Sequence, residues 1–267
     1  MLNTFQDPFM RSALMASLIV GVVCAYLGVH VVLRRVVFVG AMLSQVSAAG
    51  IGLALLFGLN PSLISLALTI VGVIIFSFRS TDRRTTRESL IGVGYVMASA
   101  LAVLFVAKSA QGEAHLLDVL SGNILTVMPQ EIMYMAIVAG VVACLHFAFG
   151  KQFLFTGLDA DTARAAGYRS GAWDLLFFLT LGVTIAFAIR LAGALLVFGF
   201  LVVPAVTALL ITDRLGRAYG IAIAAAGVAT FAGLSLSFTK DLPSGPTIVA
   251  VLSAILVITA GVKKLCR

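Results

Sequence analysis

The chain has 267 residues, of which 61% are hydrophobic and only 11% are charged, and its formal net charge is +7. A soluble domain carries roughly a quarter charged residues, so this composition, with a mean hydropathy of +1.13, excludes an ordinary soluble enzyme or binding module. The apolar residues come in blocks of roughly 17–23, the length at which a helix crosses the hydrocarbon core of a bilayer. Because backbone groups in lipid must be paired within their own segment, each block predicts a spanning helix.

The order of these blocks predicts an all-α, polytopic membrane protein of about nine transmembrane helices. Eight is the alternative, if residues 172–211 form one broken span. The predicted spans are 11–33, 36–58, 61–78, 90–107, 130–149, 172–189, 191–211, 218–237 and 246–262. They leave no room for a separate soluble domain, so we expect residues 1–267 to form a single transmembrane domain surrounded by lipid.

Lysine and arginine are divided unevenly between alternate loops. If successive loops alternate sides, one side holds 14 of the 18 basic residues, and the other holds Arg11, Lys108, Arg190 and Lys240. Loops rich in Lys and Arg stay in the cytoplasm, so we expect the N-terminus outside and the C-terminus in the cytoplasm. The positive charge follows this topology and does not indicate a nucleic-acid partner. Arg190, between two spans, is expected to anchor the outer interface.

The second block carries polar side chains inside an otherwise apolar span: Ser44, Gln45 and Ser47. Gln45 lies one helical turn from Ala41 and from Ala49, on the same face. Two interpretations are open. The Gln45 amide can present its carbonyl to a passing substrate, or it can hydrogen-bond another helix.

The loop 108–129 falls on the outer side, and His115 to Val127 predict a short surface helix there. Glu113, His115 and Asp118 form a small acidic cluster, in which the i, i+3 spacing puts His115 and Asp118 on one helical face. These side chains suit zinc or manganese. A docking patch for a basic surface of a partner is an equally good interpretation.

The polar stretch 150–171 falls on the cytoplasmic side and predicts a short exposed helix between two spans. Asp159 or Asp161 can act as the N-cap, and Gly167 is placed to end the helix. We expect such a projecting helix to dock a partner, with a plain connector as the alternative.

Glycine and proline interrupt the later spans, with Gly182 in the sixth block and Gly193, Gly199 and Pro204 in the seventh. Pro204 removes a helical hydrogen bond and is expected to kink its helix. Broken spans are the places where transporters expose backbone to substrate. The many small residues in the spans predict close helix packing and a homo-oligomer.

All eleven Asp and Glu residues fall in loops or near span ends. Ion-coupled carriers generally need an ionisable group facing the bundle interior, so their absence argues against a self-powered transporter. The sequence also contains no nucleophile–base pair and no phosphate-binding glycine loop. We therefore expect neither enzymatic activity nor a nucleotide site in this chain.

Five stretches occur in a recognisable order and cover most of the chain. They are VVLRRVVFVGAMLSQVSAAGIGLALLFG (31–58), ESLIGVGYVMASALAVL (88–104) with LLDVLSGNILTV (116–127), FTGLDADTARAAGYR (155–169), AGALLVFGFLVVPAVTALLI (192–211) and GLSLSFTKDLPSGPTIVAV (233–251). This pattern resembles the permease subunits of bacterial ABC importers for divalent metal ions, namely zinc, manganese and iron. On this resemblance we expect zinc or manganese as the substrate, and iron next.

The resemblance implies a transport subunit that binds no cofactor itself, with ATP used by a separate ATP-binding subunit. It also implies a homodimer in the bacterial inner membrane, supplied by an extracytoplasmic substrate-binding protein. The segment at about 155–169 is then the coupling helix, whose contacts with the ATPase are Asp159, Asp161, Ala163, Arg164, Ala166 and Gly167. The translocation path is expected to include Ala41, Ser44, Gln45, Ser47 and Pro204.

The chain departs from the family pattern at two positions of the second span. Family members carry Asp directly after the glycine and His four residues later, whereas this chain has Ala41 and Gln45. Neither can supply an anionic or imidazole ligand, so the sequence predicts no defined metal ligands there. A permease for a metal chelate or small organic substrate is therefore the alternative, and an autonomous channel or carrier is the second alternative.

Overall fold

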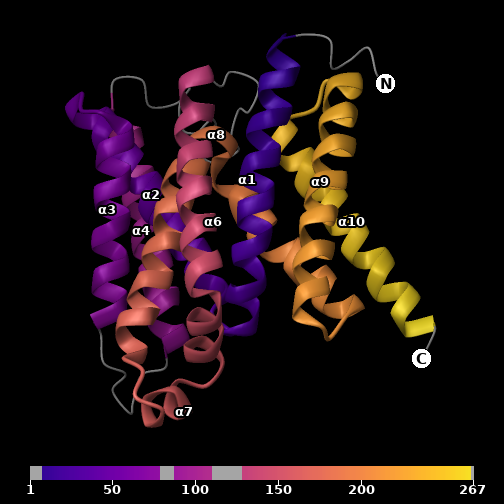
Figure 1. The fold of residues 1–267 in the computed structure, drawn as a ribbon. Helices are drawn as coiled ribbons and strands as arrows, with labels where there is room; N and C mark the ends of the chain where they lie inside the picture. Colours follow the sequence, from indigo (N-terminus) through magenta and orange to yellow (C-terminus); the bar gives the residue numbers. More distant parts are fainter. Residues whose placement is uncertain (1–7, 79–86, 110–127, 266–267) are drawn as a thin grey trace. The chain divides into compact units, whose positions relative to one another are not determined.

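The computed structural model describes residues 8–78, 87–109 and 128–265, and within these ranges it contains helices and no strands (Figure 1). The helices are α1 (Pro8–Leu33), α2 (Val37–Phe57), α3 (Pro61–Phe78), α4 (Arg87–Lys108), α6 (Pro129–Leu158), α7 (Ala160–Ala165), α8 (Ser170–Ile211), α9 (Leu215–Lys240) and α10 (Ser244–Leu265). The predicted all-α, polytopic fold is confirmed.

Seven of the described helices are long and apolar enough to cross a membrane, and α3 has a slightly shorter apolar stretch, Pro61–Ser77. Helix α8 is 42 residues long, about twice the length that one crossing needs. A break at Gly193 divides it into 170–192 and 194–211. Counted on either side of this break, the described part of the chain has nine apolar helical segments, as the sequence predicts.

The break in α8 lies at a glycine and not at the proline. Gly193 has φ 75° and ψ 161°, a region of backbone conformation that is essentially open to glycine alone. The sequence pattern predicts a kink at Pro204, but Pro204 lies inside helical backbone, and the non-helical residue of α8 is Gly193. Proline's fixed φ of about −65° lies in the helical range, so the backbone can stay helical at Pro204 even though a hydrogen bond is lost there.

The chain divides into two compact units. Unit 1 comprises Met1–Val32, Asp118–Ile137 and Ala188–Arg267, and unit 2 comprises Leu33–Leu117 and Val138–Phe187. In unit 1, Gly28 of α1 lies so close to the Leu201 carbonyl of α8 that a β-carbon at residue 28 would overlap it. This is the close backbone approach that small residues permit between helices in lipid.

In unit 2, helix α2 packs against both α3 and α4. A β-carbon at Gly50 would lie 2.5 Å from the Ser65 Cα of α3, and one at Gly52 would lie 3.0 Å from a Val106 methyl of α4. The small residues of the second span therefore seat it closely between two neighbours. This packing fixes the helix that carries most of the predicted path residues.

Candidate functional site

Helix α7 is a short exposed helix of 6 residues, and both of its ends are capped. Asp159 is the N-cap: one carboxylate oxygen accepts a hydrogen bond from the Thr162 amide at 3.0 Å, and the other accepts one from the Thr162 hydroxyl at 2.5 Å. The hydrogen bond from the Thr162 hydroxyl, and to a smaller extent the one from the Thr162 amide, hold the pKa of the Asp159 carboxyl below its ordinary value. Of the two N-caps that the sequence allows, the structure uses Asp159.

The C-terminal end of α7 is closed by Gly167, which has φ 86°. The Gly167 amide donates to the Arg164 carbonyl, and the Tyr168 amide donates to the Ala163 carbonyl, both at 3.0 Å. These two bonds form a Schellman motif, which requires the left-handed conformation that glycine adopts without strain. The sequence prediction that Gly167 ends this helix is confirmed.

Most side chains of α7 are exposed, and one is buried. Ala163 is fully buried, whereas Asp159, Asp161, Arg164, Ala166 and Gly167 are exposed. Asp161 and Arg164 form an ion pair along the surface. Figure 1 shows α7 at one end of unit 2, beyond the ends of α6 and α8 that flank it.

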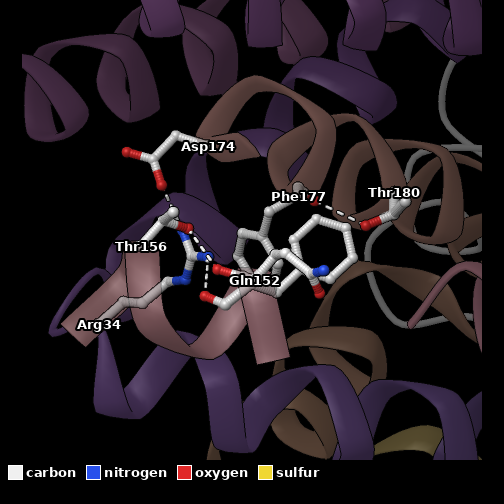
Figure 2. Close-up of polar contacts among 7 residues, drawn as sticks. Arg34, Gln152, Thr156, Asp174, Phe177 and Thr180 are labelled. Carbon is white, nitrogen blue, oxygen red and sulfur yellow. Dashed lines mark hydrogen bonds and ion pairs between the residues drawn. The ribbon is translucent and has the colours of Figure 1, made fainter. Parts of the chain in front are cut away.

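The guanidinium of Arg34 bonds to both of the helices that flank α7 in the chain, α6 and α8 (Figure 2). It lies in the turn between α1 and α2. One terminal nitrogen pairs with the Asp174 carboxylate of α8 at 2.6 Å, and the other donates to the Phe153 carbonyl of α6 at 2.7 Å. The Arg34 Cζ lies 4.0 Å from the centre of the Phe177 ring. Only 6% of the Arg34 side chain is exposed.

A glycine in α6 makes room for this arginine. A β-carbon at Gly157 would lie 2.6 Å from the Arg34 Cζ and 2.9 Å from its Cγ. Since real β-carbons do not approach other atoms so closely, the Arg34 side chain can reach its partners only past a residue without a side chain.

Two aromatic rings, those of Phe153 and Phe177, pack together next to Arg34. His146 and Thr180 contact these two residues. The Thr180 hydroxyl donates to the Phe177 carbonyl at 2.8 Å, so its contact with His146 Nε2 at 3.1 Å requires the ring N–H to donate. The His146 ring also packs against Phe153, with 4.5 Å between ring centres. All of these side chains come from α6 and α8 within unit 2.

The predicted path residues of α2 differ in their environments. Ser47 is buried, and its hydroxyl makes a 2.7 Å hydrogen bond with the Ser65 hydroxyl of α3, so it joins two helices. Ser44 is also buried, and its hydroxyl has no hydrogen-bond partner. Ala41 and Gln45 are half-buried. Within the described ranges the Gln45 amide makes no hydrogen bond to another helix, and its place in the path stays a prediction.

The structure does not test the remaining predicted site residues. Pro204 is buried in α8 within unit 1, and its place in the path stays a prediction. Glu113, His115 and Asp118 lie outside the described residues. Among residues 8–78, 87–109 and 128–265, no group of three or more His, Cys, Asp and Glu side chains could hold a metal ion.

Sequence reasoning missed the role of Arg34. The sequence places it only as one of two adjacent arginines in a cytoplasmic loop, and its neighbour Arg35 is exposed with φ 57°. The available signal was Gly157 in a polar segment, together with Asp174 near the start of the next span. No local pattern links these residues, because they lie more than a hundred positions from Arg34.

Comparison with known proteins identifies the chain's relatives. The sequence profile of the ABC 3 transport family matches residues 6–263. A probable iron transport system membrane protein of Haemophilus influenzae is 28% identical, covering 99% of this chain and 97% of its own length. The manganese transport system membrane protein MntC of Listeria monocytogenes is 27% identical, covering 94% and 89%.

Two solved structures share the fold. PsaBC from Streptococcus pneumoniae, in complex with Fab, superposes with a TM-score of 0.86 at 23% identity, covering 97% of this chain and 95% of its own. An inward-facing conformation of a putative metal-chelate type ABC transporter superposes with a TM-score of 0.76 at 17% identity, covering 96% and 89%.

Proposed function

Because the chain belongs to the ABC 3 transport family and is a multi-pass membrane permease, we propose that it carries divalent transition-metal ions inward in an ATP-driven importer. The family that the five sequence segments indicate is confirmed by the profile match. The observation that carries the proposal is this match along nearly the whole chain, with relatives named for iron and for manganese transport. We therefore test manganese and iron first, and zinc third.

The proposal places ATP hydrolysis on a separate ATP-binding subunit that docks on α7. Three features support this arrangement: α7 is exposed, it is capped at both ends, and it rests on a buried alanine. A rigid projecting helix can transmit displacement, whereas a frayed one would absorb it. The ATPase cycle would then bias the permease between outward-open and inward-open states.

The membrane orientation and further partners follow from the charge distribution and the family. The cytoplasmic side is the one that carries most Lys and Arg, so α7 and the C-terminus lie on the cytoplasmic side of the bacterial inner membrane, and the N-terminus lies on the outer side. A second copy of the chain would complete the path. An extracytoplasmic binding protein would deliver the substrate to the outer side.

One observation favours a second candidate, a permease for a metal chelate or a small organic substrate. Ala41 and Gln45 stand where the family carries Asp and His, and the nearby Ser44 hydroxyl is neutral and without a partner. A neutral, hydroxyl- and amide-lined surface suits a substrate whose metal is already coordinated. Elemental and mass analysis of the copurified binding protein separates the two, because a bare ion and an organic ligand have different signatures.

The proposed docking is tested by placing a bulky charge on α7. We expect Gly167→Arg and Ala163→Arg to abolish copurification of the ATP-binding subunit and ATP-driven ⁵⁴Mn²⁺ uptake, because residue 167 needs a left-handed backbone and residue 163 is buried. Gly216→Arg is the matched control. It places the same side chain at the start of α9, where a β-carbon meets open space, and it should retain both activities.

Two outcomes would overturn the proposal. Retention of the ATPase and of uptake in both α7 variants would remove α7 from the coupling route. Uptake of ions down their gradient by the purified chain alone, without an ATPase or ATP, would instead identify an autonomous channel or carrier.

A further inference from the structure

We propose that Arg34 is a positioning residue that makes the two flanks of α7 and the start of α2 move together. The proposal rests on the function proposed above, in which α7 receives the ATPase. It assigns to one side chain the step between the docking surface and the helix that carries Ala41 and Gln45.

The contacts of Arg34 reach both flanks of α7 from a third part of the chain. The Phe153 carbonyl precedes α7 in α6, and the Asp174 carboxylate and Phe177 ring follow it in α8. A displacement of α7 that carries its two flanks along therefore moves the guanidinium with it. The ring pair Phe155–Tyr168, 5.7 Å apart, adds a second link between the two ends of α7.

Arg34 is close to α2 along the chain. It lies three residues before Val37, where α2 begins. A helix rises about 1.5 Å per residue, so Gln45 lies only about 12 Å along the axis from Val37. A helix is stiff over this length. When the turn that holds Arg34 moves, the start of α2 therefore moves with it, including the predicted path residues Ala41 and Gln45.

The geometry requires an arginine at this position. A guanidinium presents several donors in a planar fork and can also stack on an aromatic ring, whereas a lysine ammonium is a point charge. Arg34 uses one terminal nitrogen for Asp174, the other for Phe153 and its flat face for Phe177. A lysine can keep the ion pair, but it cannot hold all three partners in the same arrangement.

The test compares two adjacent arginines. Arg34→Gln and Arg35→Gln make the same chemical change, but the Arg34 side chain is buried and contacts three residues, whereas Arg35 is exposed. Each variant is assembled with its ATP-binding subunit and Mn²⁺-loaded binding protein in liposomes, and the number of ions transported per ATP hydrolysed is measured. We expect this ratio to fall by roughly an order of magnitude in Arg34→Gln, because a buried pair loses one partner. Arg34→Lys should give an intermediate ratio, and Arg35→Gln the wild-type ratio.

The number of ions transported per ATP hydrolysed distinguishes a positioning role of Arg34 from a role in folding alone. A variant that folds less well lowers transport and hydrolysis together and leaves the ratio unchanged, so an unchanged ratio in Arg34→Gln overturns the proposal. Gly157→Ala is the second variant, for use if Arg34→Gln does not assemble. It keeps every charge and displaces only the guanidinium, and it should lower the ratio in the same direction.

Hydrogen exchange of the permease alone in nanodiscs makes the inference independent of the ATPase. We expect faster amide exchange at 153–158 and 170–174 in Arg34→Gln and Gly157→Ala than in Arg35→Gln. Equal exchange in all three variants overturns the Arg34 link even if the docking function holds. Failure of the wild-type chain to copurify with any ATPase overturns the docking function, and with it the transmission role assigned to Arg34.

Discussion

Asp159 shows how one exposed carboxylate can hold a short helix in shape. Its pKa is lowered because the hydroxyl and amide of Thr162 donate hydrogen bonds to the charged form. A carboxyl whose pKa is lowered by folding stabilises the folded state at pH values above its unfolded pKa, and this contribution is lost as the pH falls through the lowered pKa. Helix α7 should therefore keep its N-cap at neutral pH and lose it in acid.

The first prediction concerns this cap. Nuclear magnetic resonance of the Thr162 amide should show wild-type α7 fraying only below the ordinary aspartate value of about 3.9. Asp159→Asn keeps a good capping acceptor that does not titrate, so its Thr162 signal should be independent of pH. Asp159→Ala should fray at every pH. A wild-type signal that does not change in acid would show that the carboxylate is not the cap in the membrane.

At the scale of the residue, the sequence predicts local features and misses distant ones. The cap at Asp159 and the stop at Gly167 could be predicted because each depends on a few neighbouring residues. The different fates of Arg34 and Arg35 could not, because they depend on where α6 and α8 come to lie. Two identical side chains, adjacent in sequence, differ only through tertiary contacts.

At the scale of the element, Arg190 explains why α8 continues as helix through the predicted boundary between the spans 172–189 and 191–211. The sequence places this charge in a gap between the sixth and seventh blocks. In the structure Arg190 lies within α8 and pairs with Glu131 of α6 at 2.6 Å, with about a third of its side chain exposed. A paired arginine at the edge of the apolar region is compatible with continued helix, so the interruption occurs instead at Gly193, three residues later.

The break at Gly193 can be tested by substitution. Gly193→Ala should lower the melting temperature of the permease in detergent, because φ 75° and ψ 161° cost a residue with a β-carbon about 1–3 kcal/mol. Gly227→Ala in α9 is the matched control, since a β-carbon there meets open space. Alanine is a better helix former than glycine by up to about 1 kcal/mol, so the control should be as stable as the wild type or more so. Equal melting temperatures for the two variants would contradict a strained backbone at residue 193.

At the scale of the whole molecule, the surrounding lipid explains why so many large apolar side chains are exposed, which a soluble protein could not tolerate. Large apolar side chains are widely exposed on α4, α6 and α10, among them Val96 at 65%, Phe147 at 94% and Val257 at 69%. In water such faces would drive aggregation, whereas lipid tails or a second copy of the chain cover them without cost. Hydrophobic block length is a local property, which is why the number of spans could be predicted before the packing was known.

The translocation path stays a prediction. The sequence singles out the second span by its polar residues, and the structure places Ala41 and Gln45 half-buried along one stretch of α2. Ser47, predicted as a path residue, has its hydroxyl bonded to Ser65 of the neighbouring helix. A pattern of polar residues cannot tell a lining hydroxyl from one that joins two helices, because both satisfy the same periodicity.

The last prediction asks whether that face of α2 meets the substrate. Ala41→Asp combined with Gln45→His puts a carboxylate and an imidazole at i and i+4, where their side chains can share a manganese or zinc ion. Tighter holding of an ion in a path slows its release, so we expect more metal retained by the purified permease and slower uptake. Ala41→Asn with Gln45→His matches the first variant in shape and lacks the negative charge, so it should retain less metal. If both double variants match the wild type in metal content, uptake rate and selectivity, Gln45 only packs between helices, and the substrate crosses the membrane elsewhere.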